Sequence, residues 1–202
     1  TGNDRETYLV DPSTGVKIYS DSLSTIYDNL YTTHRFGANY RVNEKKYNYT
    51  VGLAVQPATI ESNTLTGVKQ RFSQDIVNFF PVVRFAYNFS KSRSFNFNYN
   101  GNTNQPSYSQ LQPVTDFSNP QYIVQGNPNL RPEFTNTVSL RYNNFDMVSG
   151  NVFFGNLSYS FTQDKIVNDV QQLPRAVQKT TYRNSNGFYT VFAFYNISKP
   201  IK

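Results

Sequence analysis

The residues that most often carry out catalysis are few in this sequence and lie far apart. His34 is the only histidine and the chain has no cysteine, so neither a histidine cluster nor a thiolate can bind a metal ion here. Two of Glu133, Asp164 and Asp169 could act as a carboxylate pair only if folding brought them together, and solvated loop acids are the better interpretation. The short motifs of serine hydrolases, zinc proteases, nucleotide-binding loops and EF-hands are absent. We therefore predict no enzymatic activity, no cofactor and no metal site.

Nucleic-acid binding is a second chemistry to consider, because the net charge is +6 and the stretch RSFNFNYN (93–100) sets a basic residue beside alternating aromatic ones. The glycines of an RNA-recognition motif are missing from this stretch. The nearby basic residues Lys45, Lys46, Lys91 and Arg93 fall in predicted turns, where they would be solvated and would not follow a phosphate backbone. The sequence therefore predicts no nucleic-acid partner.

Arginine and asparagine side chains at alternate positions are better candidates for binding. Amides both donate and accept hydrogen bonds, and a guanidinium group donates several, so a row of them could contact a passing polar solute or a plug domain. The alternative is that they hydrogen-bond one another. The candidate positions are Arg84, Asn88, Asn96, Asn98, Asn100 and Arg141.

Three aromatic residues of a long polar connection form a second candidate group. Tyr108, Phe117 and Tyr122 could stack on a ligand such as a sugar or an aromatic chelate. Packing within the loop is an equal alternative for the same three rings.

These candidates must be positioned by β-strands, because the sequence predicts an all-β chain. From Tyr47 to Val55, apolar residues alternate with small or polar ones, which is the period of a strand with two different faces. The pattern recurs and predicts about seven long strands, each near the 9 to 11 residues that a tilted strand needs to cross a bilayer. The other segments lie near 36–40, 83–89, 95–99, 138–142, 153–161 and 188–197.

The connections between these segments alternate between short and long, as in outer-membrane barrels. Short turns fall at 42–46, 90–94 and 144–151, and aromatic residues flank each of them, as an interfacial girdle requires. The predicted fold is an antiparallel up-and-down meander, part of a transmembrane outer-membrane β-barrel, with residues 1–202 as a fragment of one barrel domain. The alternative is a soluble β-sandwich that binds glycans. The predicted long outer loops lie near 1–30, 58–78, 101–132 and 163–187.

The segment GNPNLRPE, preceded by QPSYSQLQP (105–113) and FSNPQY (117–122), resembles the barrel region of TonB-dependent outer-membrane receptors, and in particular their outer-membrane β-barrel family. The resemblance implies a plugged barrel of about 22 strands in the cell outer membrane. It also implies outer-membrane lipid, a plug domain, the TonB energy-coupling system and a small unidentified solute as partners. The motif residues are Gly126, Asn127, Pro128, Asn129, Leu130, Arg131, Pro132 and Glu133.

The two prolines of this motif suggest a role for it. Pro128 and Pro132 each fix φ near −65° and favour an extended conformation in the residue before them. We expect them to stiffen the return from an external loop, and we expect Glu133 to begin the next strand at the rim of the barrel.

Overall fold

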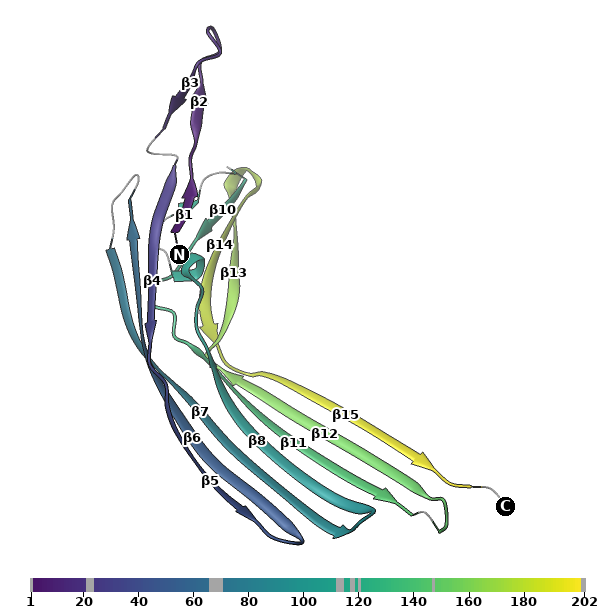
Figure 1. Ribbon diagram of the computed structural model, residues 1–202. Helices are drawn as coiled ribbons and strands as arrows, with labels where there is room; N and C mark the ends of the chain where they lie inside the picture. The colour runs from purple at the N-terminus through teal and green to yellow at the C-terminus, as the bar shows by residue number, and fades with distance from the viewer. Residues whose placement is uncertain are drawn as a thin grey trace.

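A computed structural model describes residues 2–20, 24–65, 71–111, 115–116, 119, 121–146 and 148–200. Its main feature is a nine-stranded antiparallel sheet in the order β1-β4-β6-β7-β8-β11-β12-β15, in which β5 also pairs with β6 (Figure 1). The sheet is open: β15 lies at one edge, and β1, β4 and β5 lie at the other. The strands are β1 (Gly2–Arg5), β4 (Thr25–Thr33), β5 (Phe36–Asn43), β6 (Tyr47–Thr64), β7 (Arg71–Ser90), β8 (Arg93–Asn104), β11 (Glu133–Phe145), β12 (Val152–Gln163) and β15 (Phe188–Ser198).

The register of this sheet gives it two chemically distinct faces, because residues paired across antiparallel strands share a face. We call these the apolar face and the polar face. One row across the sheet defines the apolar face: Tyr49, Phe85, Phe97, Leu140 and Leu157. The adjacent row defines the polar face: Thr50, Arg84, Asn98, Ser139 and Ser158.

The antiparallel all-β fold predicted from the alternation is confirmed. The prediction of a long loop near 58–78 is wrong. β6 has 18 residues and β7 has 20, so both strands run through most of that segment. The cause is an inversion of the pattern. Up to Val55 the apolar residues of β6 lie on the apolar face, whereas Ala58 and Ile60 lie on the other face and are buried there. A search for one continuous alternation misses a strand that changes phase.

The inversion at Pro57 also coincides with a break between β4 and β5. Together these two strands follow one edge of β6, with Thr33 opposite Ala58 and Phe36 opposite Val55. Proline has no N–H for the ladder, and its carbonyl instead accepts a hydrogen bond from His34 N at 3.2 Å.

The segment near 163–187 is also ordered, which corrects the prediction of a loop. It forms β13 (Lys165–Leu173), a 3₁₀ turn η1 (Pro174–Ala176) and β14 (Val177–Ser185). Positive φ values of 52° at Asp164 and 94° at Gly187 mark the bend where this hairpin leaves β12 and β15. With the strands of the 101–132 connection, it builds a second sheet in the order β13-β14-β10-β9. Those strands are β9 (Thr115–Asp116) and β10 (Tyr122–Gln125), and the same connection holds α1 (Tyr108–Leu111).

The N-terminal segment expected as a loop likewise contains strands, namely β1, most of β4 and the hairpin of β2 (Tyr8–Val10) with β3 (Lys17–Tyr19). The register also assigns both faces of β15, which the sequence leaves open. Phe192 and Phe194 lie opposite Ser158 and Asn156 on the polar face, and Val191 lies opposite Tyr159 on the apolar face.

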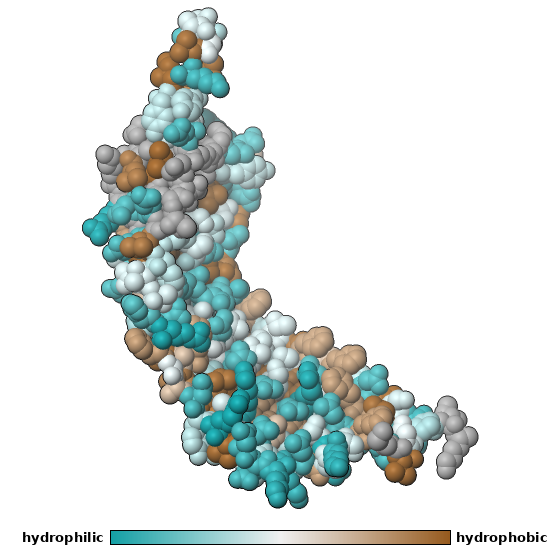
Figure 2. Space-filling model, in the orientation of Figure 1, coloured by the Kyte–Doolittle hydropathy of each residue, from teal (hydrophilic) through white to brown (hydrophobic). Residues whose placement is uncertain are grey.

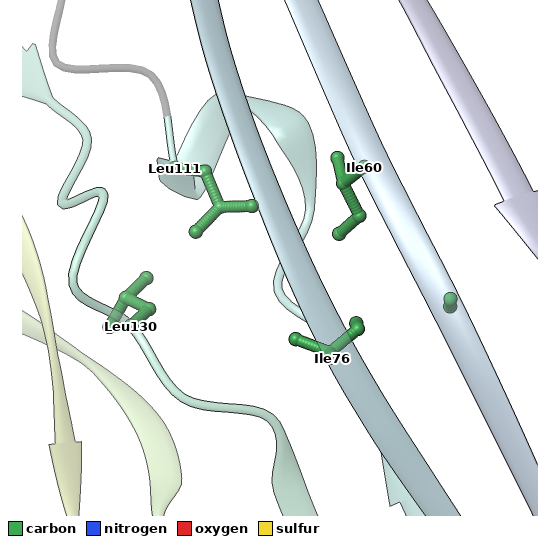
Figure 3. Close-up of a cluster of buried hydrophobic side chains, with 5 residues drawn as sticks. Ile60, Ile76, Leu111 and Leu130 are labelled. Carbon is green, nitrogen blue, oxygen red and sulfur yellow. The ribbon is translucent and has the colours of Figure 1, made fainter.

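A small buried core lies away from the short turns, where the second sheet and α1 cover the polar-face side of β6 and β7. Leu130 has 0% exposure and Leu111 has 1%, and in Figure 3 both point toward Ile60 and Ile76 from the chain opposite these strands. Phe72, Tyr108, Ile166 and Tyr182 pack against this cluster. The segments between strands therefore fold over the polar face, and they bury apolar residues that would otherwise line it.

Gly101 is a position where the apolar face has no room for a side chain. A Cβ atom there would stand 2.6 Å from Phe134 Cζ and 2.7 Å from Pro81 Cγ. We expect Gly101→Ala to lower the free energy of unfolding of the full-length protein by about 1–3 kcal/mol, because the proline ring cannot rotate away. Gly155→Ala is the matched control, since its Cβ would meet Phe153 at an ordinary 3.4 Å. Urea titration in detergent micelles measures both, and equal midpoints for the two variants would contradict the expectation.

Candidate functional site

The structure brings the six predicted polar residues together on one surface. Arg84 lies opposite Asn98 and Asn96 lies opposite Arg141, so β7, β8 and β11 present them side by side on the polar face. Asn88 lies opposite Ser94 and Asn100 opposite Thr137, on the same face. In Figure 2, hydrophilic side chains predominate over the lower half of the sheet. Their contact with a solute or a plug stays a prediction.

A ladder of hydroxyl groups adjoins these residues on the polar face. Cross-strand pairs of β11 and β12 stand 3.0, 3.1 and 3.3 Å apart, so each hydroxyl has a partner and the ladder needs no ligand. The sequence analysis does not identify it, although Thr and Ser alternating on two neighbouring segments is a visible signal. The pairs are Thr135–Thr162, Thr137–Ser160 and Ser139–Ser158.

The asparagines nearby are arranged differently. Within the described part of the chain, no hydrogen bond engages the side chains of Asn96, Asn98 or Asn100, so they do not hydrogen-bond one another. The amide groups of this part of the wall therefore keep their donors and acceptors available to something in front of it.

Arginines give the polar face a positive charge. Arg41 Nε donates to Thr50 Oγ1 at 3.2 Å, the Arg35 guanidinium lies 4.0 Å from the centre of the Phe80 ring, and that of Arg141 lies 5.8 Å from the centre of Phe154. Together with Arg84 they make four arginines. Over the described strands β5 to β8, β11, β12 and β15, the polar-face carboxylate is that of Glu133, and it is paired with Lys165. The wall should therefore attract anions.

Two of the three aromatic residues of the long connection are described, and the structure does not bring these two together as a stacking site. Tyr108 lies in α1, packs against the buried core, and has a hydroxyl group buried without a hydrogen-bond partner. Burial raises the pKa of Tyr108, and the neighbouring Tyr31 adds to this increase. Tyr122 begins β10 and is 58% exposed. Phe117 lies outside the described residues. The position of Tyr108 fits loop packing.

The GNPNLRPE motif is a junction between segments that are distant in the sequence. The Asn127 side-chain amide donates to the Tyr182 carbonyl at 2.9 Å, and its Oδ1 accepts from Asn129 N at 3.0 Å. The backbone N–H of Asn127 donates to the Gln110 carbonyl at 2.6 Å. The carbonyl of Leu130 accepts from Gln74 Nε2 at 3.2 Å, while its side chain fills the buried core. The motif thus ties β7, α1 and β14 together.

The second half of the motif is held by two ion pairs. Arg131 Nη2 contacts Asp164 Oδ1 at 2.6 Å, and Lys165 Nζ contacts Glu133 Oε1 at 3.1 Å. Asn184 brackets Arg131, because its Oδ1 accepts from Arg131 N and its Nδ2 donates to Arg131 O, both at 2.9 Å. Glu133 also accepts from the backbone N–H of Ile166 at 2.8 Å and is buried.

These contacts correct the interpretation of two acids as solvated. Glu133 and Asp164 both anchor the bend between β12 and β13, whereas Asp169 lies opposite Thr181 farther along the hairpin and joins neither of them. β11 begins at Glu133, as the sequence predicts. The prolines alone suggest stiffness, but the one aliphatic residue of the motif, Leu130, is the signal that could have revealed a packing role.

The apolar face stays uncovered over the lower half of the sheet. Leu53, Leu157 and Val191 are 49%, 43% and 57% exposed. Near the short turns the aromatic rings contact one another, with centroids 6.4 Å apart for Phe89 and Tyr142 and 5.9 Å for Tyr142 and Phe153. An apolar belt edged by aromatic rings is the surface that a lipid-facing barrel wall requires. No helix in the described residues is both long and apolar enough to cross a membrane.

Comparisons with known proteins agree with this architecture. The solved structure of the copper transporter OprC is similar with a TM-score of 0.68 and 12% identity, over 100% of this chain and 32% of OprC. The siderophore receptor PirA from Pseudomonas aeruginosa is similar with a TM-score of 0.52 and 13% identity, over 89% of this chain and 43% of PirA. This chain therefore spans less than half of either protein. No curated protein matches it in sequence.

The family model named the outer membrane protein beta-barrel family matches residues 2–202, which is nearly the whole sequence. The two-faced strands, the exposed apolar belt and the open antiparallel sheet are what a section of such a barrel wall must have. The chain belongs to the outer membrane protein beta-barrel family.

Proposed function

We propose that this chain is part of the wall of a TonB-dependent receptor that takes up a small polar, preferentially anionic solute through the outer membrane. The observation that carries the proposal is the polar face, where Arg41, Arg84 and Arg141 stand among asparagine amides on the side opposite the lipid-facing belt. Such a surface offers hydrogen bonds and positive charge along a lumen without closing it to polar molecules. The protein resides in the cell outer membrane.

The neighbouring structures support a transport role by analogy of fold. One is a copper transporter and the other a siderophore receptor, and at 12% and 13% identity their cargoes do not carry over to this chain. A plug domain inside the barrel and coupling to TonB are parts of the same proposal. An external gate over the lumen is also part of the proposal, because the second sheet and α1 fold over the polar face and bury a core there.

The alternative of a soluble glycan-binding sandwich has less support. A sandwich buries one face of each sheet against the other, whereas the apolar face here keeps Leu53, Leu157 and Val191 exposed. The aromatic residues offered for glycan stacking are separated, because Tyr108 packs into the core while Tyr122 lies at the surface.

Uptake measurements test the proposal in the full-length protein. Among labelled small polar solutes, cells that express it should accumulate an anionic one preferentially, and deletion of TonB should abolish that uptake. Combined Arg84→Gln and Arg141→Gln should reduce uptake several-fold, because the wall loses two positive charges near the passing solute. Arg175→Gln, in the 3₁₀ turn η1, removes a charge at a distance and is the matched control.

Two results would argue against it. Uptake that persists unchanged without TonB would point to a passive channel, and equal losses from the wall variants and Arg175→Gln would remove the polar face from the path of the solute.

A further inference from the structure

A cavity of about 520 Å³ opens where the β13–β14 hairpin bends away from β12 and β15. Its lining includes Arg131, Tyr159, Phe161, Asp164 and Tyr189, and we call it the rim pocket. The rim pocket contains the Arg131–Asp164 ion pair of the motif and places it beside aromatic residues of β12 and β15. Neither the buried core nor the proposed uptake path accounts for these aromatic residues.

Four aromatic residues line the rim pocket; Phe188 lies opposite Thr162 on the polar face, and the other three belong to the apolar face. Tyr159 lies opposite Val138 and Phe161 opposite Tyr189, all on that face. The ring centroids of Tyr159 and Phe161 are 5.9 Å apart, and those of Tyr159 and Tyr189 are 6.4 Å apart, so the three form one continuous surface. This surface faces the lipid and not the lumen.

The level of the rim pocket in the membrane follows from strand length. β12 has 12 residues between the short turn and the bend, which matches the length of about 9–11 residues that crosses the hydrocarbon core. On β6 the polarity pattern inverts at Pro57, a similar distance after the strand begins at Tyr47. The bend at Asp164 therefore stands at the outer interface, and the three aromatic rings lie at the top of the lipid-facing belt.

The polar part of the rim pocket is a positioned cation. The side chain of Arg131 is 70% exposed, and Asp164 contacts one of its terminal nitrogens. Since a guanidinium group carries five N–H donors, others stay available to an anion. Two hydrogen bonds to Asn184 fix the backbone of Arg131, so the cation is held at the pocket by more than its ion pair. Arginine binds phosphate well because two parallel N–H groups match two of its oxygens.

We propose that the rim pocket binds the phosphorylated headgroup of a lipid from the outer leaflet. Its phosphate contacts Arg131 on the water side, and its acyl chain lies against Tyr159, Phe161 and Tyr189 on the lipid side. Amphipathic rings at an interface suit this arrangement. A free anion would use the arginine but not the rings, and a solute in the lumen would meet the opposite face of the sheet.

Binding of a bis-phosphorylated glycolipid, lipid A, to the full-length protein in detergent tests this inference. Native mass spectrometry should detect bound lipid A, and Arg131→Gln should weaken binding about tenfold, the loss of one charge-assisted contact. Arg71→Gln is a closely matched control, because Arg71 is 71% exposed and is also paired with a carboxylate, that of Glu61 at 3.7 Å. It should change the affinity less than twofold.

Further measurements test whether the phosphate of the lipid is the group that Arg131 contacts. Dephosphorylated lipid A should bind as weakly to the wild type as lipid A binds to Arg131→Gln. Arg131→Lys keeps the charge and the ion pair but loses the paired N–H groups, so it should bind with intermediate affinity; this variant serves if Arg131→Gln fails to fold.

Several results would overturn the inference. They are the absence of lipid A binding to the wild type, equal binding of the dephosphorylated form, equal weakening by Arg71→Gln, or full displacement by inorganic phosphate at a concentration that matches the lipid. TonB-dependent uptake would be unaffected by any of them, so failure here is distinguishable from failure of the proposed function.

Discussion

Leu157→Arg is expected to destabilise the full-length protein in a bilayer by several kcal/mol, roughly 2–4, while Ser158→Arg on the next residue of the same strand is expected to have a much smaller effect. Leu157 occupies the middle of β12 on the apolar face and is 43% exposed, so the new guanidinium group would lie in hydrocarbon. Near the midplane of a barrel this costs roughly 2–4 kcal/mol. Ser158 points to the polar face, where an arginine would remain hydrated, on the strand next to that of Arg141.

Refolding into lipid vesicles measures the difference between the two variants. The fraction that acquires heat-modifiable gel mobility, titrated against urea, reports the free energy of folding for each. We expect Ser158→Arg to lose about 1 kcal/mol at most, the value of its hydroxyl pair with Ser139. If Ser158→Arg were the more disruptive of the two, the faces would be assigned the wrong way round.

The different expectations for Leu157 and Ser158 depend on the alternation of faces along a strand, which was the most predictable feature of the sequence. Alternation over the segment from Tyr47 to Val55 and its repeats gives both the strands and their faces, because the side-chain period of a strand is fixed at two residues. The short turns were equally predictable, because aromatic residues flank each of them. The rings that flank the last turn, Tyr142 and Phe153, are in contact in the structure.

The outer half of the strands was not predictable by the same reasoning. Beyond Pro57 and Val77, water replaces lipid outside the sheet and folded chain replaces the lumen inside it, so the preference of each face reverses. Ile60 and Ile76 are then apolar residues on the polar face, and they break the alternation that is expected of a membrane-spanning strand. Their burial depends on Leu111 and Leu130, which arrive from 35 to 70 residues away along the chain.

The motif illustrates a different limit. Its resemblance to a family identified the segment, and Glu133 does begin a strand, but the partners of its side chains could not be derived. Asn127 binds Tyr182, Arg131 binds Asp164 and Glu133 binds Lys165, and each of these contacts closes a long loop whose course the sequence does not state. Local chemistry indicates a stiff segment, whereas its function as a junction is a property of the fold.

Leu130→Ala tests that junction, and we expect it to release the β13–β14 hairpin while the barrel wall stays folded. The side chain of Leu130 has 0% exposure and touches a core of few residues, so its loss leaves a cavity worth roughly 2–5 kcal/mol in a unit that has little other apolar burial. Trypsin should then cut at Lys179 and Arg183 within β14, at least tenfold faster than in the wild type, because cleavage requires the strand to open.

Leu173→Ala is the matched control for this cleavage, since Leu173 ends β13 in the same hairpin but is 37% exposed and lies outside the core. Retained heat-modifiable mobility would show that the wall of Leu130→Ala is intact. The polar contacts of Asn127 and Asn184 also hold the hairpin, and if they sufficed alone, both variants would be cut at the wild-type rate. A selective increase for Leu130→Ala would instead assign the stability of the external assembly to one buried side chain, with the hydrogen bonds setting its orientation.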